Sequence, residues 1–140
     1  MVCRKVKVVK KPAVFSLFIG VSAPGIQPDS IGCTYEDSSS YGMWSHGQVI
    51  AAGQTIIDDY TKLPASSIIQ ADLFEQREWS SDKVFRAGDE VVVVLDCTAH
   101  TLRLQSPTVQ HVIPIQQQHH QQQWVLNVSF GGGDYQITVG

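Results

Sequence analysis

The chain has 140 residues, of which 43% are hydrophobic, and its formal net charge is −3. This length allows one compact domain over residues 1–140 but not two independent hydrophobic cores. Five of the ten basic residues fall within the first eleven positions, so the rest of the sequence is acidic and lacks the basic face expected of a nucleic-acid-binding domain. No apolar stretch approaches the length of a transmembrane span.

The three cysteines, Cys3, Cys33 and Cys97, are odd in number and widely spaced, and no apolar signal-peptide core follows Met1. These features argue against a disulfide framework and against secretion. We therefore expect a reducing compartment, the cytoplasm or the nucleus. Because the chain starts within a strand-like pattern, a fragment of a longer protein is also consistent with the sequence.

Residues 1–14 form a basic segment in which Val6 and Val8 alternate with Lys5 and Lys7, and Pro12 follows. This alternation predicts a strand that ends at the proline. Lysines on a terminal strand are typical of a solvated segment, or of an edge strand that they protect against aggregation. We favour these interpretations over a surface that attracts an acidic partner.

Three further strand signals follow. Residues 15–21 carry an apolar residue at every second position and are followed by Pro24-Gly25, which predicts a strand with a defined end. Residues 31–35 predict a third strand. Residues 41–45 and 48–52 flank His46-Gly47, whose glycine can adopt the positive φ of a tight turn, so the two segments predict a hairpin.

The alternation fades between residues 55 and 81, which we interpret as an insertion. Ser66 or Ser67 precedes apolar residues at helical spacing and could cap one or two helical turns. The sequence therefore predicts a short helix within an otherwise β-rich chain.

The clearest signal lies at residues 88–105. A run of β-branched residues from Val91 to Leu95 is typical of a buried strand, and the alternation of Leu102 and Leu104 with polar residues is typical of a half-exposed strand. Asp96 begins the polar turn between them. We predict a hairpin at the centre of the domain.

In the last third of the chain, residues 109–115 predict a short strand that Pro114 places at an edge. Residues 116–123 form a low-complexity Gln/His tract, expected to be a flexible loop with no contribution to a core. Residues 124–130 and 135–139 alternate as strands joined at a glycine-rich bend. Many short strands with at most one helix predict an all-β fold, an antiparallel two-sheet β-sandwich.

Several short motifs occur in a fixed order along the chain. Residues 18–21 read Phe-Ile-Gly-Val, residues 88–96 read Gly-Asp-Glu-Val-Val-Val-Val-Leu-Asp, and residues 101–104 read Thr-Leu-Arg-Leu. With Ser30-Ile31-Gly32, Tyr41-Gly42 and the last two strand segments, they resemble the SPRY domain family of concanavalin-like β-sandwiches. The resemblance covers roughly residues 15–139, and it departs from the family in its short N-terminal part, in the insertion before Trp79 and in the Gln/His tract.

The resemblance implies a protein-interaction module that recognises a peptide or protein surface through loops at one end of the sandwich, with no catalysis. Such modules are often parts of a larger ubiquitin ligase or scaffold. The residues themselves leave two alternatives open. One is a carbohydrate-binding, lectin-like domain on the same two-sheet architecture, and the other is a structural or self-association domain that uses edge strands or the glutamines.

No catalytic, metal or cofactor site is predicted. Cys97 and His100 have ligand-like spacing, but a zinc site needs about four ligands, and the turn residues are explained by Asp96 bonding backbone amides with Cys97 as buried filler. No Gly-x-Ser-x-Gly motif for a hydrolase occurs. Residues 131–133 are glycines that precede a strand, so they lack the helix N-terminus that receives a phosphate.

Aromatic residues beside turns are the better candidates for binding, because loops on a rigid scaffold carry function and Tyr and Trp dominate interfaces. For Trp44 and Trp79 the alternative of a place in the core stays open. The predicted partner is a protein or peptide, bound by loops near residues 41–48 and by the insertion before Trp79. The sequence leaves the oligomeric state undetermined. The candidate binding residues are Tyr35, Tyr41, Trp44, His46 and Trp79.

Overall fold

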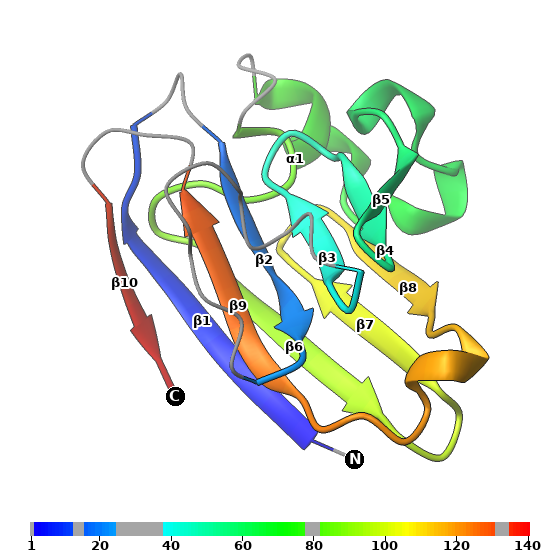
Figure 1. Cartoon of the computed structure of the whole chain (residues 1–140). Helices are drawn as coiled ribbons and strands as arrows, with labels where there is room; N and C mark the ends of the chain where they lie inside the picture. The colour runs from blue at the N-terminus through cyan, green and yellow to red at the C-terminus, as the bar shows by residue number, and fades with distance from the viewer. Residues whose placement is uncertain (1, 13–15, 25–37, 78–81, 131–134) are drawn as a thin grey trace.

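In a computed structural model of the chain, the structure describes residues 2–12, 16–24, 38–77, 82–130 and 135–140. The strands of these residues form two antiparallel sheets of five strands each. The sheets pack face to face, with one short helix and several 3₁₀ turns gathered at one end (Figure 1). The predicted all-β, two-sheet sandwich is confirmed.

The first sheet has the strand order β10-β1-β6-β7-β8. Its β6–β7 hairpin, with Val93 opposite Leu104, confirms the hairpin predicted at the centre of the domain. β8 lies at one edge, as Pro114 predicted. The strands are β1 (Val2–Lys10), β6 (Glu90–Asp96), β7 (Thr101–Gln105), β8 (Gln110–Pro114) and β10 (Gln136–Val139).

The second sheet has the order β5-β4-β3-β2-β9. The hairpin predicted around His46-Gly47 is confirmed as β3 and β4. β5 was not predicted, because it lies at an edge and is mostly exposed, so its sequence carries no apolar alternation. The strand expected over residues 31–35 lies outside the described residues. The strands are β2 (Leu17–Ser22), β3 (Tyr41–Trp44), β4 (Val49–Ala51), β5 (Gln54–Ile57) and β9 (Val125–Phe130).

The basic N-terminal strand is an internal strand of its sheet, which corrects the expectation of a solvated or edge segment. In β1, Val6 lies opposite Val139 of β10 on one side and opposite Val91 of β6 on the other. Val6 and Val8 are fully buried, whereas Lys5 and Lys7 are exposed. The lysines therefore mark one face of the strand, and a face pattern says nothing about whether the strand's backbone edges are paired.

Side chains on the facing sides of the two sheets form the main core. On β2, Leu17, Ile19 and Val21 point into this core, and Phe18 lies on the opposite face, as their alternation predicted. The outward-facing Phe18 packs with Trp44 and Ile50 in a second, smaller buried cluster. Both faces of β2 are therefore covered with side-chain packing.

The insertion between β5 and Lys83 contains two 3₁₀ turns, η2 (Tyr60–Lys62) and η3 (Ala65–Ser67), and the helix α1 (Ala71–Gln76). The predicted short helix exists, but its cap was predicted wrongly. Gln70 occupies the N-cap position without a side-chain hydrogen bond. Ser67 instead lies in η3, where its Oγ is 2.8 Å from Nδ1 of His111 on β8.

The Gln/His tract contacts the sandwich, contrary to the expectation that it would contribute nothing to a core. It contains the 3₁₀ turn η5 (Gln117–His119). Nδ1 of His119 lies 2.6 Å from the hydroxyl of Tyr41, and the ring of His120 stacks on that of His100 with 3.6 Å between centroids. Composition predicted a solvated tract because glutamine carries no apolar signal, but the two histidines supply ring contacts.

The last two strands do not pair with each other. β9 pairs with β2 in the second sheet, where Val128 lies opposite Ile19, and β10 pairs with β1 in the first sheet. The two strands thus lie at the outer edges of the two facing sheets. Trp124, Leu126 and Val128 are partly buried against the core, so this face contributes to the core without dominating it.

Candidate functional site

One end of the sandwich carries the β3–β4 turn and the insertion, and a tight glycine contact joins them. Gly47 in the turn has a φ of +98°, a conformation that favours glycine. A Cβ atom at this position would lie 2.5 Å from both N and Cα of Tyr60. The amide of Tyr60 donates to the carbonyl oxygen of His46 at 2.9 Å. Glycine at position 47 therefore lets η2 lie directly on the turn.

The insertion also binds the edge of the first sheet. Ile68 forms an antiparallel bridge with Val109, and the amide of Ile69 donates to the carbonyl oxygen of Thr108 at 2.9 Å. The hydroxyl of Thr108, which is fully buried, in turn donates to the carbonyl oxygens of Lys83 and Val84 at 2.9 Å. The insertion is thus fixed to both sheets by backbone hydrogen bonds.

A buried lysine fixes the insertion's aromatic residues. Lys83 is 8% exposed, and its ammonium donates to the carbonyl oxygen of Phe74 at 3.1 Å. The same ammonium lies 5.4 Å from the ring centroid of Tyr60 and 5.2 Å from that of Phe74, and the two rings meet edge to face. Hydrogen bonding and the negative faces of the two rings compensate for the burial of this charge.

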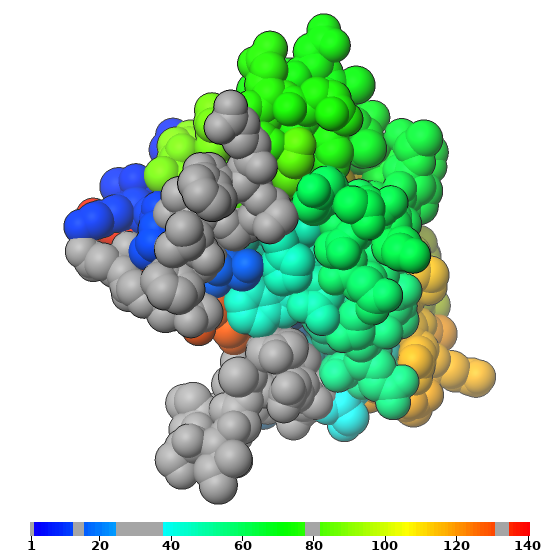
Figure 2. Space-filling model, turned by 90° about the horizontal axis from the view of Figure 1, so that it is seen from above, coloured from blue at the N-terminus to red at the C-terminus, as the bar shows by residue number. Residues whose placement is uncertain are grey.

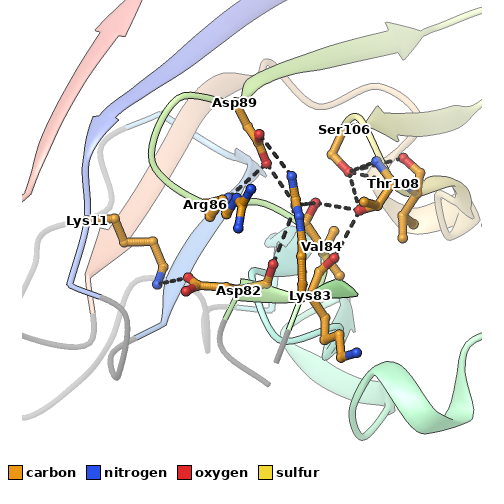
Figure 3. A network of polar contacts seen from close by, with 10 residues as sticks. Lys11, Asp82, Lys83, Val84, Arg86, Asp89, Ser106 and Thr108 are labelled. Atoms are coloured by element: carbon orange, nitrogen blue, oxygen red, sulfur yellow. Dashed lines mark hydrogen bonds and ion pairs between the residues drawn. The ribbon is translucent and has the colours of Figure 1, made fainter. Parts of the chain in front are cut away.

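Two ion pairs hold the chain that follows α1. Arg77, at the C-terminal end of the helix, faces Asp89 just before β6, and Nη1 lies 2.9 Å from Oδ2. Lys11 lies 2.9 Å from Asp82 (Figure 3). The carboxylate of Asp89 also accepts from the amide of Arg86 at 2.9 Å. Figure 3 shows these contacts next to the Thr108 hydrogen bonds, so one polar network connects the insertion, β1 and β8.

The outward side of this end is exposed and of mixed chemistry. Figure 2 looks onto it and shows the green atoms of the insertion standing beside the cyan and teal atoms of β3 to β5. Ile69 is 43% exposed, and Lys62, Asp72 and Glu75 are exposed around the same segment. We call the exposed side of residues 58–77 the insertion platform. It combines an apolar residue with both signs of charge on a backbone fixed at several points.

Two of the predicted binding residues, Tyr41 and Trp44, lie in the core. Tyr41 is fully buried and Trp44 is 7% exposed, so neither ring offers contact area to a partner. The hydroxyl of Tyr41 accepts from the amide of Gln116 at 3.1 Å, and it also forms a hydrogen bond of 2.6 Å with Nδ1 of His119. Burial raises the pKa of this phenol. Tyr35 and Trp79 lie outside the described residues.

His46 is at the turn, as predicted, but it is half-buried. Its Nδ1 lies 2.8 Å from Oγ of Ser16, and its ring lies beside that of Trp44 with 6.2 Å between centroids. Burial lowers the pKa of His46, and the nearby charge of Asp59 opposes this shift only in part. The shift favours the neutral imidazole, and the hydrogen bond to Ser16 ties the turn to the start of β2.

Sequence reasoning pointed to the loops near residues 41–48 and to the insertion before Trp79, but it did not name the exposed residues of the insertion platform. It singled out aromatic residues beside turns, whereas the exposed positions are a β-branched residue, Ile69, and charged residues such as Lys62. One signal was present: Ile69 is an apolar residue within a polar insertion that lacks a strand pattern. Its backbone is held by a long-range hydrogen bond to Thr108, which no local pattern reveals.

The β6–β7 turn has a structural explanation. Oδ1 of Asp96 accepts from the amides of Thr98 at 3.0 Å and Ala99 at 2.9 Å, as predicted for a turn. Cys97 is exposed, so the expectation that it fills a buried space was wrong. Within the described ranges, no group of three or more His, Cys, Asp or Glu side chains is placed to hold a metal ion, and no helix is long and apolar enough to cross a membrane.

Comparison with known proteins gives a structural likeness. No family model matches the sequence, and no curated protein matches it. The structure is similar to the SPRY domain of human HERC1, with a TM-score of 0.63 and 13% sequence identity, over 98% of this chain and 72% of that chain. Because it covers 98% of this chain, the likeness spans both sheets. The chain has a SPRY-like β-sandwich fold.

Proposed function

We propose that this chain is a protein-interaction domain that recognises a protein or peptide surface through the insertion platform and the adjoining β3–β4 turn. The supporting observation is the attachment of the insertion to both sheets, through Tyr60 on one side and Ile69 on the other. A surface whose backbone is fixed before binding loses little conformational freedom when a partner docks. The SPRY-like fold is consistent with such a role.

The composition of the platform favours a protein partner. Half-exposed Ile69 provides an apolar contact, and exposed charged side chains such as Lys62 and Glu75 belong to the same insertion; protein interfaces combine apolar and polar residues in this way. Sugar binding through Trp44 is not part of the proposal, because its ring is too deeply buried to stack on a saccharide. Self-association remains an outcome of the experiments below.

Affinity purification with quantitative mass spectrometry tests the proposal. Ile69→Asp should remove the partners captured by the wild-type domain, because the substitution places a charge at the apolar centre of the platform. Val112→Asp is a matched control, since Val112 is also β-branched and is 47% exposed, on β8. Retention of every partner by Ile69→Asp would contradict the proposal.

Two finer statements belong to the same proposal. Membership of a ubiquitin ligase or scaffold predicts that ligase subunits are among the partners lost in Ile69→Asp. A location in the cytoplasm or nucleus is supported by Cys3 and Cys97, which are both free and exposed, as thiols remain in a reducing compartment. Imaging of a fluorescent fusion checks the location, and sedimentation at several concentrations tests self-association.

A further inference from the structure

A second candidate site lies between the two sheets, at the end opposite the insertion. A cavity of about 490 Å³ opens there, with a lining that is mostly apolar. Val93 and Leu95 of β6 line it from the first sheet, and Val21, Trp124 and Leu126 line it from the second. Val21 lies near the end of β2, whereas the β3–β4 turn contacts Leu17 at its beginning. The ends of β2 and β6 that carry these lining residues point away from the insertion (Figure 1), so the cavity is separate from the insertion platform.

The alternation of β1 explains one wall of this cavity. Val2, Arg4, Val6 and Val8 share one face of the strand, and the last two are fully buried in the core. Arg4, opposite Val93, therefore faces the space between the sheets, as its place in the cavity lining confirms. A strand position that would ordinarily extend the core thus carries a guanidinium at the mouth of an apolar cavity.

This guanidinium has no carboxylate partner within the described part of the chain. The two ion pairs found there use Lys11 and Arg77 as their cations. The other rim residues are apolar: Val2 and Val139 are each 50% exposed and Val125 is 43% exposed. Exposed apolar side chains grouped around a concave site are typical of a ligand-binding surface.

We propose that this cavity binds a small amphipathic carboxylate, a medium-chain fatty acid anion, with its hydrocarbon chain between the sheets and its carboxylate on Arg4. The volume falls within the range of about 300–1,000 Å³ that is usual for small-molecule sites. An arginine fork matches a carboxylate and forms charge-assisted hydrogen bonds with it. An added β-strand fits less well, because β10, the adjoining edge of the first sheet, has only four residues.

Titration of the purified chain with decanoate, octanoate and decanol, followed by ¹H–¹⁵N NMR, tests this site. The indole signal of Trp124, identified with a Trp124→Phe variant, should shift as decanoate binds, together with the amides of Val93 and Leu126. Octanoate should bind about tenfold more weakly, since two fewer methylene groups are buried. Decanol should also bind more weakly than decanoate, because it lacks the charge.

Substitutions then separate the head group from the cavity. Arg4→Gln should weaken decanoate binding about tenfold and leave decanol binding unchanged. Lys5→Gln is the matched control, because Lys5 is the next residue on β1 and faces away from the cavity; it should leave both affinities unchanged. Val139→Glu adds a negative charge at the half-exposed rim, so it should weaken the binding of decanoate more than the binding of decanol. Amide spectra of the unliganded variants establish that they are folded.

Three results would overturn this assignment. The first is an absence of shifts at Trp124 with decanoate, including the case in which the chain instead dimerises through this face. The second is an equal loss of decanoate binding in Arg4→Gln and Lys5→Gln, which would indicate general charge attraction. The third is binding of decanol as tight as that of decanoate. None of these results bears on the insertion platform, whose partner binding is measured separately.

Discussion

Arg77 and Asp89 form a two-pronged ion pair in which Nη1 lies 2.9 Å from Oδ2 and Nη2 lies 3.0 Å from Oδ1. Arg77 is 3% exposed and Asp89 is 8% exposed, so the pair is shielded from water. Nη1 of Arg77 also donates to the carbonyl oxygen of Val84 at 3.2 Å. The C-terminal end of α1 is thereby joined to the residues that lead into β6.

Removing one member of this pair should leave a buried charge without a partner. We predict that Arg77→Met or Asp89→Asn lowers the free energy of unfolding by about 3–5 kcal/mol, measured by urea denaturation. The double variant Arg77→Met/Asp89→Asn should lose less than the sum of the two, because neither charge is then left buried alone. Single-variant losses below about 1 kcal/mol, the range of surface pairs, would show that the pair is solvated.

The contact between Gly47 and Tyr60 predicts a different effect. Gly47→Ala should displace η2 from the β3–β4 turn, because the added Cβ would meet the backbone of Tyr60 at 2.5 Å and the positive φ disfavours alanine. Partner binding should weaken together with stability. Gly88→Ala is the control: it shares a positive φ, but nothing lies within 4 Å of its Cβ position. Equal loss of partner binding in both variants would contradict a specific role for the Gly47 contact.

Tyr41 and Trp44 should behave as core residues. Each alanine substitution is predicted to cost about 3–5 kcal/mol of stability, as usual for large buried aromatic side chains. Tyr41→Phe keeps the ring and removes only the hydroxyl between Gln116 and His119, so it should cost about 1–3 kcal/mol. Thermal unfolding of the three variants checks this order. An unchanged melting temperature in Tyr41→Ala would contradict the placement of this residue in the core.

The burial of His46 and His111 predicts a loss of stability in mild acid. Burial lowers the pKa of His46 and of His111 below the ordinary value of 6.5, so the unfolded chain binds their protons more readily than the folded chain. The free energy of unfolding should therefore rise with pH up to about 6.5 and level off above it. Urea denaturation between about pH 5 and pH 7.5 measures this slope, in a window above the ordinary carboxylate range.

The variant His46→Gln/His111→Gln provides the control for this slope. With both imidazoles removed, the free energy of unfolding should vary less with pH over the same window. The pKa values of Asp59 and Asp96 are also lowered, through hydrogen bonds to nearby donors, so their contributions are lost only in stronger acid. A slope that is unchanged in the double variant would assign the effect to other groups.

Much of the fold could be predicted because its signals are local. The valine run of β6 and the alternation of Leu102 and Leu104 on β7 indicate which side chains face the core. Asp96 indicates the turn between the two strands. The glycine of the β3–β4 turn likewise predicted a positive φ and a tight hairpin. Patterns of this kind depend on neighbouring residues alone.

The candidate site depends on contacts between distant residues and could not be predicted in the same way. The hydroxyl of Tyr41 is satisfied by His119, which is 78 positions away, so a tyrosine beside a turn lies in the core. The backbone of Ile69, whose side chain is half-exposed, is held by a hydrogen bond to Thr108, a residue distant in sequence. The lysines of the N-terminal strand indicate a solvated face, which led to the expectation of a solvated or edge segment. The strand is internal because β10, from the other end of the chain, pairs with it.

Site-specific photo-crosslinking tests most directly the central claim that the insertion platform is the surface that binds a protein partner. A photoreactive amino acid is introduced at position 69 on the platform, or at position 112 on the outer side of β8, and crosslinked products are identified by mass spectrometry. The account predicts that partners captured by the wild-type domain crosslink from position 69 and not from position 112. Crosslinks from position 112 alone would contradict it.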